Sequence, residues 1–488
     1  MRRFNLSEPG EILLISCYEL GHQPAALAQP MGFLEAAGFR PAALDVAVEA
    51  FDGDRITAAH LIAISVPMHT ALRLGADLIG RIRAINPSAH VTLYGLYASL
   101  NAEYLLAHGA DSVIGGEYER PLVELAQALQ SGRRPADAIG VSLRDRITEP
   151  YLERTSSFPV PSRAALPPLA RYARVVDHRG ERLAGYVEAS RGCLHLCRHC
   201  PIVPVYEGRF FVVPEATVLD DIRRQVQDGA THITFGDPDF LNGPGHAIRL
   251  VRALHAEFPS VTFDVTTKIE HLLKHRDLLP ELAAAGCLFV ISAVESFNDT
   301  VLEHLQKGHT CADIEAALAF ARDAGLTLRP SLVAFTPWTA LEEYVDLFAT
   351  IDRLDLIEAV DPVQYTVRLL VPPGSALLDD PLPHPITEFI TELDQAGFQH
   401  RWAHPDARMD RLQRDVSALV EADAQAGAPI AETFHRLWML AARAAGRPAP
   451  ALTPRERRPA PRMTEPWFCC SEPTAEQHAA ITTVASHP

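Results

Sequence analysis

Hydrophobic residues in the first part of the chain fall into short apolar runs that alternate with longer segments of helical periodicity. The short runs lie at 11–16, 61–65, 91–94 and 111–114, and the longer segments include 31–37 and 71–85. Short buried strands that alternate with helices are typical of a parallel sheet with helices on both faces. The pattern over residues 1–135 therefore predicts a doubly wound, Rossmann-like α/β domain.

A second alternating series covers residues 181–380. We expect its strands near 183–190, 231–235, 261–266, 287–293, 328–334 and 363–370, with helices between them. Six such units suit a partial (βα)6 TIM-like barrel, in which chemistry takes place at the carboxyl ends of the strands.

The remaining segments complete the expected division of the chain. Residues 136–180 are rich in proline and only weakly periodic, which predicts a linker laid over the surface. Residues 381–446 are predicted to form a helical C-terminal region. A stretch rich in proline and arginine, Pro448 to Pro466, opens the last part, 447–488, which we expect to be an extended or flexible linker followed by a tail.

Composition narrows the possible functions. The chain has 488 residues, 48% of them hydrophobic, so it can bury more than one core. A formal net charge of −17 argues against nucleic-acid binding, which needs a basic surface. No apolar run reaches the roughly 18 residues of a membrane span, and the first run, 12–15, is too short for a signal peptide. We therefore expect a cytoplasmic protein with no nucleic-acid or membrane partner and with reduced thiols.

Three cysteines stand within eight residues. Cys193, Cys197 and Cys200 have the spacing C-x3-C-x2-C and follow the strand expected at 185–190 directly. Thiolates are the usual ligands of iron–sulfur clusters. Three of them on a [4Fe–4S] cluster leave one iron open for a cosubstrate. The alternative is a zinc site, with His195 or His199 as the fourth ligand.

This loop, placed after the first strand of a six-unit βα series, resembles the radical S-adenosylmethionine superfamily. The resemblance implies that S-adenosylmethionine binds the open iron. It also implies that a reductant such as flavodoxin or ferredoxin supplies an electron, and that a small-molecule substrate is modified by radical chemistry. His199 stands where the family usually places an aromatic residue beside the adenine.

The segments after the next strands resemble the cosubstrate site of the same family. The candidate residues are Gly236, Asp237, Asp239, Lys268, Ser292, Glu295 and Arg368. By this resemblance the two aspartates would hold the amino group of S-adenosylmethionine, and Lys268 its carboxylate. Arg368 could clamp an anion. The structural alternatives are helix caps for the aspartates, a surface position for Lys268, and an ion pair with an acid for Arg368.

The first domain resembles the cobalamin-binding module that often precedes such a barrel. Gly95, Gly115, Gly116 and Glu117 follow the strands expected at 91–94 and 111–114, and the glycines would let a bulky ligand approach the backbone. The D-x-H-x-x-G motif that supplies a histidine to cobalt is absent. The resemblance thus implies either cobalamin bound without that histidine or a module kept as a scaffold.

Two adjacent cysteines, Cys469 and Cys470, lie in the tail. Adjacent thiols hold thiophilic species or cycle between redox states. The segment Cys-Cys-Ser-Glu-Pro resembles the ending of radical enzymes with a CUAEP or CCAEP tail, where U is selenocysteine; Ser471 departs from that pattern. By analogy with arsenic-handling relatives, the pair would hold a metalloid substrate. The alternative is an incidental exposed pair.

Three functions remain open at this point. The first is a radical enzyme that modifies a substrate, such as an arsenic or selenium species held by Cys469 and Cys470. The second is a cobalamin-dependent radical methyltransferase. The third is a non-catalytic iron–sulfur or metalloid sensor, which would not need the cosubstrate residues that follow strands two to four.

Overall fold

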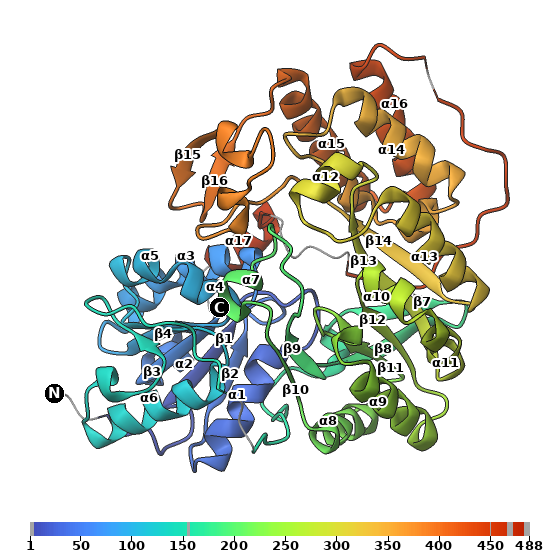
Figure 1. The fold of residues 1–488 in the computed structure, drawn as a ribbon. Coiled ribbons are helices and arrows are strands. Elements are labelled where there is room, and N and C mark those ends of the chain that lie inside the picture. The colour runs from blue at the N-terminus through green and yellow to red at the C-terminus, as the bar shows by residue number, and fades with distance from the viewer. Residues whose placement is uncertain (1–3, 154–156, 449, 466–471, 483–488) are drawn as a thin grey trace.

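The computed structural model describes residues 4–153, 157–448, 450–465 and 472–482. Its main elements are a six-stranded and a seven-stranded sheet, each packed with helices, that lie side by side (Figure 1). Within these residues no helix is both long and apolar enough to cross a membrane.

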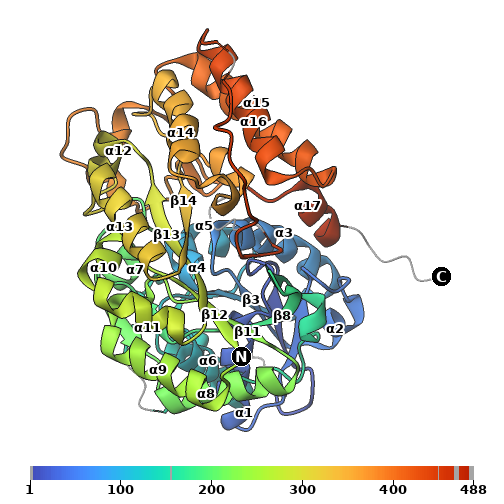
Figure 2. The ribbon, with the colours of Figure 1, turned by 90° about the vertical axis from the view of Figure 1, so that its right-hand side faces the viewer.

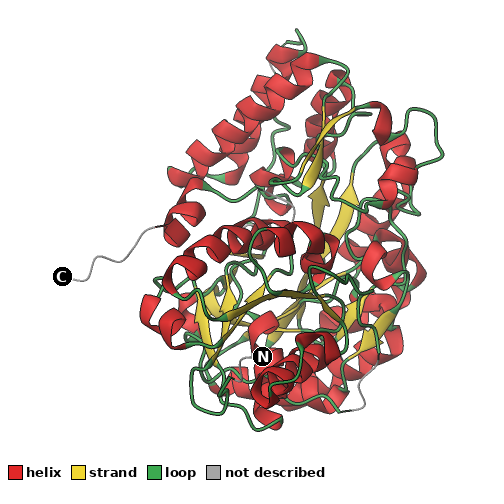
Figure 3. Ribbon diagram, turned by 90° about the vertical axis from the view of Figure 1, so that its left-hand side faces the viewer, coloured by secondary structure: helices red, strands yellow, loops and turns green. Residues whose placement is uncertain are grey.

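The first sheet has the order β2-β1-β3-β4-β5-β6. Its strands are β1 (Ile12–Ser16), β2 (Ala42–Asp45), β3 (Leu61–Ser65), β4 (His90–Tyr94), β5 (Ser112–Ile114) and β6 (Val141–Ser142). All are parallel except β6, which pairs antiparallel with β5. Helices α1 (Ala25–Ala36) and α6 (Glu119–Ser131) share one core, and α2 (Gly53–Ala58), α3 (His69–Ile85) and α5 (Ala102–Ala107) share another. Helices on both faces (Figure 3) confirm the predicted doubly wound domain.

The second sheet forms a curled half-barrel. Its parallel strands follow chain order: β8 (Gly180–Val187), β11 (His232–Phe235), β12 (Thr262–Thr266), β13 (Cys287–Glu295) and β14 (Thr327–Leu332). One continuous core joins them to the helices between them, which are α8 (Glu215–Gln227), α9 (Pro244–Glu257), α10 (Ile269–Lys274), α11 (Leu279–Ala284), α13 (Cys311–Asp323) and α14 (Leu341–Arg353). These helices lie along the outside of the sheet (Figure 2).

The sixth barrel strand, expected at 363–370, does not form. Pro362–Tyr365 is a 3-10 helix instead, and a single bridge between Phe335 and Arg368 marks the sixth position. Pro362 has no backbone N–H to donate to a ladder, and its fixed φ favours a turn at this point.

Residues 136–180 are not a separate linker. They supply β6 to the first sheet and β7 (Arg174–Asp177), which pairs antiparallel with β8, to the second. Tyr151 also bridges to Gly116. The segment therefore adds to both sheets, and strands this short are defined by their partners rather than by their own sequence.

Residues 381–446 are not wholly helical. A hairpin of β15 (Ile390–Asp394) and β16 (Gln399–Trp402) precedes α15 (Ala407–Gln425) and α16 (Ile430–Ala444). The backbone N–H of Gly397 donates to the Asp394 carboxylate at 2.8 Å and closes the turn. An Asx-type turn of this kind competes effectively with helix.

The C-terminal part folds back over both domains. Residues 450–461 have no regular structure, but β17 (Arg462–Met463) then pairs with β7, and α17 (Ala475–Thr482) packs on α3. In Figure 1 the red helix α17 lies above the first sheet, whereas the red chain after α16 runs down the right-hand side of the picture. Residues 450–461 are thus extended without regular structure, as one form of the expected linker, whereas β17 and α17 are regular elements that the sequence did not predict.

Candidate functional site

The cysteine loop extends from a short two-stranded ribbon beyond the end of β8. Strand β9 (Ser190–Gly192) pairs antiparallel with β10 (Phe210–Val212), and the loop runs between them. Gly192 has φ 73°, and a Cβ there would lie 2.4 Å from the carbonyl oxygen of Arg209. Only glycine tolerates both the positive φ and the lack of space for a Cβ. Gly192 therefore determines the backbone path at the start of the loop.

The three thiols are close together and poorly solvated. Cys193 and Cys197 are buried and Cys200 is half-buried. Burial, together with the neighbouring Cys197 thiol, raises the pKa of Cys200 to about 12. Such thiols deprotonate readily only when a cation binds, and this is the behaviour of a metal or cluster site. The residues present therefore fit a [4Fe–4S] cluster.

A buried ion pair lies beside this loop. Glu295, at the end of β13, accepts from Lys307 Nζ at 3.0 Å and contacts His199 Nε2 at 3.2 Å. Burial opposes ionisation of Glu295, but the Lys307 ammonium and the His199 ring hold its pKa below the usual range. Glu295 also has φ 63°, a strained conformation of the kind found at functional sites.

Lys307 is a site residue that the sequence did not single out as a contact. Burial alone would lower its pKa, but Glu295 and the thiols of Cys197 and Cys200 raise it, so the side chain stays charged beside the loop. The available signal was its rarity, since the chain has only three lysines.

Several buried polar atoms around the loop have no hydrogen-bond partner within the described chain. They include His199 Nδ1, Asn242 Nδ2 and Ser292 Oγ. Asn242 also accepts from the Leu194 backbone N–H at 3.3 Å, so it touches the loop directly. Buried polar groups without partners are rare in proteins and point to a missing ligand. Their position suits a polar cosubstrate, and sequence reasoning missed Asn242.

Of the two aspartates predicted for the amino group, Asp237 is engaged through both oxygens and Asp239 through one. Asp237 accepts from the Ala189 N–H at 3.0 Å and from the Ser190 hydroxyl, and burial raises its pKa to about 7. Asp239 accepts from Thr267 Oγ1 at 2.6 Å and caps the turn at Leu241. Helix-type capping, the structural alternative, thus describes Asp239. Gly236 has its own reason to be glycine, because a Cβ would overlap the Tyr186 ring.

The two cationic candidates differ. Lys268 is buried, with its Nζ 3.5 Å from Glu270, so the surface alternative is wrong. Arg368 donates to Asp410 and to the Trp402 carbonyl, each at 2.7 Å, and its guanidinium stacks on the Trp402 ring. Arg368 therefore has the structural pairing that was its alternative, because the hairpin and α15 cover it.

The carboxyl edge of the first sheet meets the cysteine loop. Glu117, after β5, accepts from Tyr206 Oη at 2.8 Å and pairs with Arg191 at 3.3 Å. Arg191 also contacts Glu119 at 2.5 Å and Glu188 at 2.9 Å, and all four side chains are buried or nearly so. This network holds the two carboxyl edges together.

The glycines at that edge pack against the protein itself. A Cβ on Gly115 would lie 2.4 Å from the Ser99 side chain, and one on Gly116 2.2 Å from the Tyr151 carbonyl oxygen. Gly95 faces the Val66 carbonyl at 3.3 Å. The packing of the protein itself thus accounts for these glycines, and their contact with a bulky ligand stays a prediction. Ser65 Oγ and His69 Nδ1, at the same edge, are buried without a hydrogen-bond partner in the described chain.

Two residues of the tail also contact this edge. Glu465 accepts from Tyr18 Oη at 2.8 Å. Glu472 lies 3.3 Å from the buried His69 Nε2, 3.3 Å from Arg73 Nε and 2.9 Å from Gln399 Nε2. Cys469 and Cys470 lie outside the described residues.

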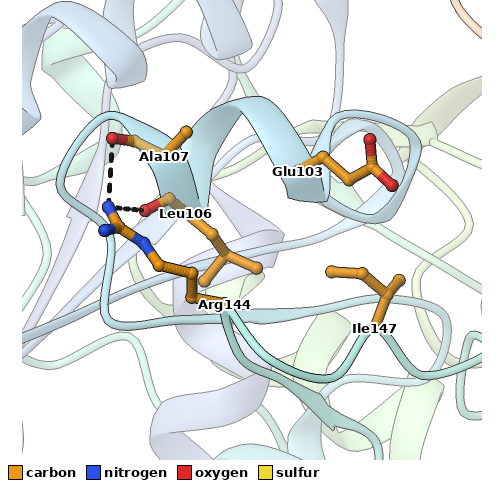
Figure 4. Close-up of a pocket in the computed structure, with 5 residues that line it drawn as sticks. All are labelled: Glu103, Leu106, Ala107, Arg144 and Ile147. Atoms are coloured by element: carbon orange, nitrogen blue, oxygen red, sulfur yellow. Dashed lines mark hydrogen bonds between the residues drawn. The ribbon is translucent and has the colours of Figure 1, made fainter.

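A surface pocket on the first domain offers no comparable chemistry. Arg144 lies beside α5 and donates to the carbonyls of Leu106 and Ala107 at 3.0 and 3.2 Å (Figure 4). The one cation at this pocket thus has a structural role.

Comparisons with known proteins agree with this geometry. Residues 187–345 match the Radical SAM superfamily. An uncharacterized methyltransferase of Pyrococcus horikoshii is 23% identical over 319 residues, which cover 63% of this chain and 67% of that protein. The radical S-adenosylmethionine methyltransferase TsrM of Kitasatospora setae has a TM-score of 0.64 at 19% identity and covers 84% of this chain and 88% of its own. The cobalamin-dependent S-adenosylmethionine radical enzyme OxsB has a TM-score of 0.67 at 16% identity. The match covers 84% of this chain and 67% of OxsB.

The structural likeness extends over both domains and establishes the fold. The family match begins at the end of β8 and includes the cysteine loop and the segments after β11, β12 and β13. Domains of this family use a [4Fe–4S] cluster, S-adenosylmethionine and an electron donor. A Radical SAM domain thus spans residues 187–345 of this chain, and the chain is an enzyme.

Proposed function

We propose that the enzyme cleaves S-adenosylmethionine at a cluster held by Cys193, Cys197 and Cys200 and modifies a small molecule presented at the carboxyl edge of its first domain. The observation that carries this proposal is the network of Glu117, Tyr206 and Arg191, which joins that edge to the cysteine loop. A group held on the first sheet would therefore lie next to the site of radical formation.

The chain's own residues have distinct parts in this scheme. The cluster, when bound and reduced, supplies the electron that cleaves S-adenosylmethionine. The ion pair of Glu295 and Lys307 keeps a fixed dipole beside the loop, and His199 contacts the same carboxylate. Asn242 and Ser292 offer buried polar atoms to the cosubstrate. Flavodoxin or ferredoxin is the electron donor we expect.

The first candidate substrate is a metalloid species, arsenic or selenium, held by Cys469 and Cys470. The observation that favours it is the contact of Glu465 and Glu472 with the first domain. These residues flank the double cysteine in sequence, and both meet side chains at the edge that adjoins the cluster loop.

The second candidate is cobalamin-dependent methyl transfer. Cobalamin, when bound, carries methyl groups between a donor and an acceptor. The fold likeness to OxsB and TsrM supports this candidate, as do the unpartnered Ser65 Oγ and His69 Nδ1.

One experiment separates the two candidates. The full chain is reconstituted with its cluster, reduced with dithionite and given S-adenosylmethionine with arsenite, with hydroxocobalamin, or with neither, and products are identified by mass spectrometry. An arsenic-containing adduct that disappears in Cys470→Ala supports the tail as carrier. Cobalamin that remains bound through gel filtration supports the second candidate. If the experiment gives no arsenic adduct and no retained cobalamin, both assignments are contradicted.

A further inference from the structure

We propose that His195, Asp239 and His271 bind a divalent transition-metal ion beside the cysteine loop. His195 belongs to that loop, Asp239 follows β11, and His271 lies on α10. One ligand atom from each lies within 4.8 Å of the other two. Asp239 Oδ2 is 2.7 Å from His271 Nδ1 and 3.3 Å from His195 Nε2.

The three facing atoms are buried and unsatisfied. His195 Nε2, Asp239 Oδ2 and His271 Nδ1 each have no hydrogen bond of acceptable geometry within the described chain. Three such atoms in one place would be costly unless something binds between them. A cation accepts a lone pair from all three at once.

The surroundings hold the ligands in place. The other oxygen of Asp239 accepts from Thr267 Oγ1 at 2.6 Å and from the Leu241 N–H at 3.2 Å, so Oδ2 is left to face the histidines. His195 Nδ1 lies 3.5 Å from a Glu270 carboxylate oxygen. A carboxylate behind a histidine is the usual arrangement at metal sites, where it orients the ring and increases its basicity.

The ligand set indicates the class of metal. Two imidazoles and one carboxylate suit Zn²⁺ or Fe²⁺, and three protein ligands leave coordination positions open. This ion would be separate from the zinc alternative raised by the cysteine spacing. Both histidines of the loop face carboxylates, His195 towards Asp239 and His199 towards Glu295.

The site extends the proposed function without depending on it. A metal with an open position next to the cysteine loop can bind and polarise an oxygen or sulfur donor of a substrate. Asp239 then acts as a metal ligand rather than as a contact for the amino group of S-adenosylmethionine.

The test counts metal in the full chain. The protein carries Cys469→Ser and Cys470→Ser to remove the tail thiols, and its cluster is reconstituted before Zn²⁺ is added. After gel filtration, iron and zinc are measured by mass spectrometry. Full iron loading shows that the cysteine loop is occupied and cannot hold zinc. We expect one zinc per chain in addition to the cluster iron.

Paired variants on α10 and at the residue that follows it provide the control. His271→Gln should weaken zinc binding by at least about tenfold, whereas His275→Gln, whose ring lies 5.6 Å from that of His271, should not. Zn²⁺ should also raise the melting temperature of the parent and of His275→Gln but not of His271→Gln. The proposal is overturned if the parent retains no zinc at full iron loading, or if His271→Gln retains as much as His275→Gln. Either result would mean that the three side chains form only a polar contact.

Discussion

Lys307 is buried beside two of the cluster cysteines, and its charge is the most consequential single feature of the site. We predict that Lys307→Met shifts the midpoint potential of the cluster to more negative values, because a cation near the thiolates favours the reduced cluster. Lys307→Arg keeps the positive charge, so its midpoint potential should lie closer to that of the parent. Redox titration monitored by electron paramagnetic resonance measures this. An unchanged potential in Lys307→Met would show that the ammonium does not act on the cluster.

Asp45 gives a pH dependence that is independent of the cluster. It is buried at the end of β2 and accepts from Tyr172 Oη at 2.9 Å, and burial raises its pKa to about 6. An unfolded aspartate titrates near pH 3.9, so between about pH 4 and 6 the folded chain holds a proton that the unfolded chain releases. The contribution of Asp45 to the free energy of unfolding is therefore largest at low pH and decreases as the pH rises through this window.

Asp45→Asn should remove that dependence. Relative to the parent, the variant should gain stability from about pH 4 to 7, by up to roughly 3 kcal/mol. Denaturant unfolding of the cluster-free chain at a series of pH values measures the difference, with the exposed Asp323→Asn as control. A constant difference between variant and parent across the range would refute the assignment.

At the scale of elements, the β9–β10 ribbon determines whether the cysteine loop can form. Gly192→Ala would place a Cβ 2.4 Å from the Arg209 carbonyl oxygen at φ 73°. We predict a clear loss of bound iron after reconstitution. Gly180→Ala is the matched control, because Gly180 has φ 90° but no atom within 4 Å of the added Cβ. Equal iron content in the two variants would argue against this function of the ribbon.

Glu472 is one of the residues through which the tail contacts the first domain. Glu472→Ala removes its contacts with His69, Arg73 and Gln399. Hydrogen exchange of α17 should then become faster, because the segment before that helix is released. Glu456→Ala, at an exposed position in the proline-rich stretch, should leave the exchange of α17 as it was. Unchanged exchange in both would show that Glu472 does not hold the tail.

Some elements could be predicted from the sequence, and the exceptions have physical causes. The apolar runs identified the parallel strands of both series except β2, because those strands are largely buried on both faces. Strand β2 has only four residues and was not predicted. The prediction of a sixth barrel strand was wrong because it followed the run of apolar residues and gave too little weight to Pro362, which starts a 3-10 helix there. Strands β6 and β7 and the β15–β16 hairpin were missed because their pairing partners, not their own patterns, define them.

The candidate site divides in the same way. The cysteine spacing is local in sequence, so it indicated the cluster ligands directly. Lys307, Asn242 and the pairing of His195 with His271 depend on side chains that the barrel brings together from different βα units. The choice between the two interpretations of Arg368 could not be made from the sequence, because the acid that binds it, Asp410, lies on a helix 42 residues further on.

At the scale of the whole molecule, the buried Arg191 joins the two domains. It pairs with Glu117 and Glu119 from the first domain and with Glu188 from the second. A charge buried among three carboxylates fixes the relative position of the groups it joins. Both carboxyl edges therefore meet at the cysteine loop, and the account of this enzyme rests on chemistry at that junction.

The most direct test is cleavage of S-adenosylmethionine by the reconstituted, reduced full chain under anaerobic conditions. Chromatography with mass spectrometry should detect cleavage products that require dithionite and that are lost in Cys193→Ala. Equal cleavage by Cys193→Ala, or none from a parent chain with a fully loaded cluster that binds S-adenosylmethionine, would contradict the account and favour a sensor.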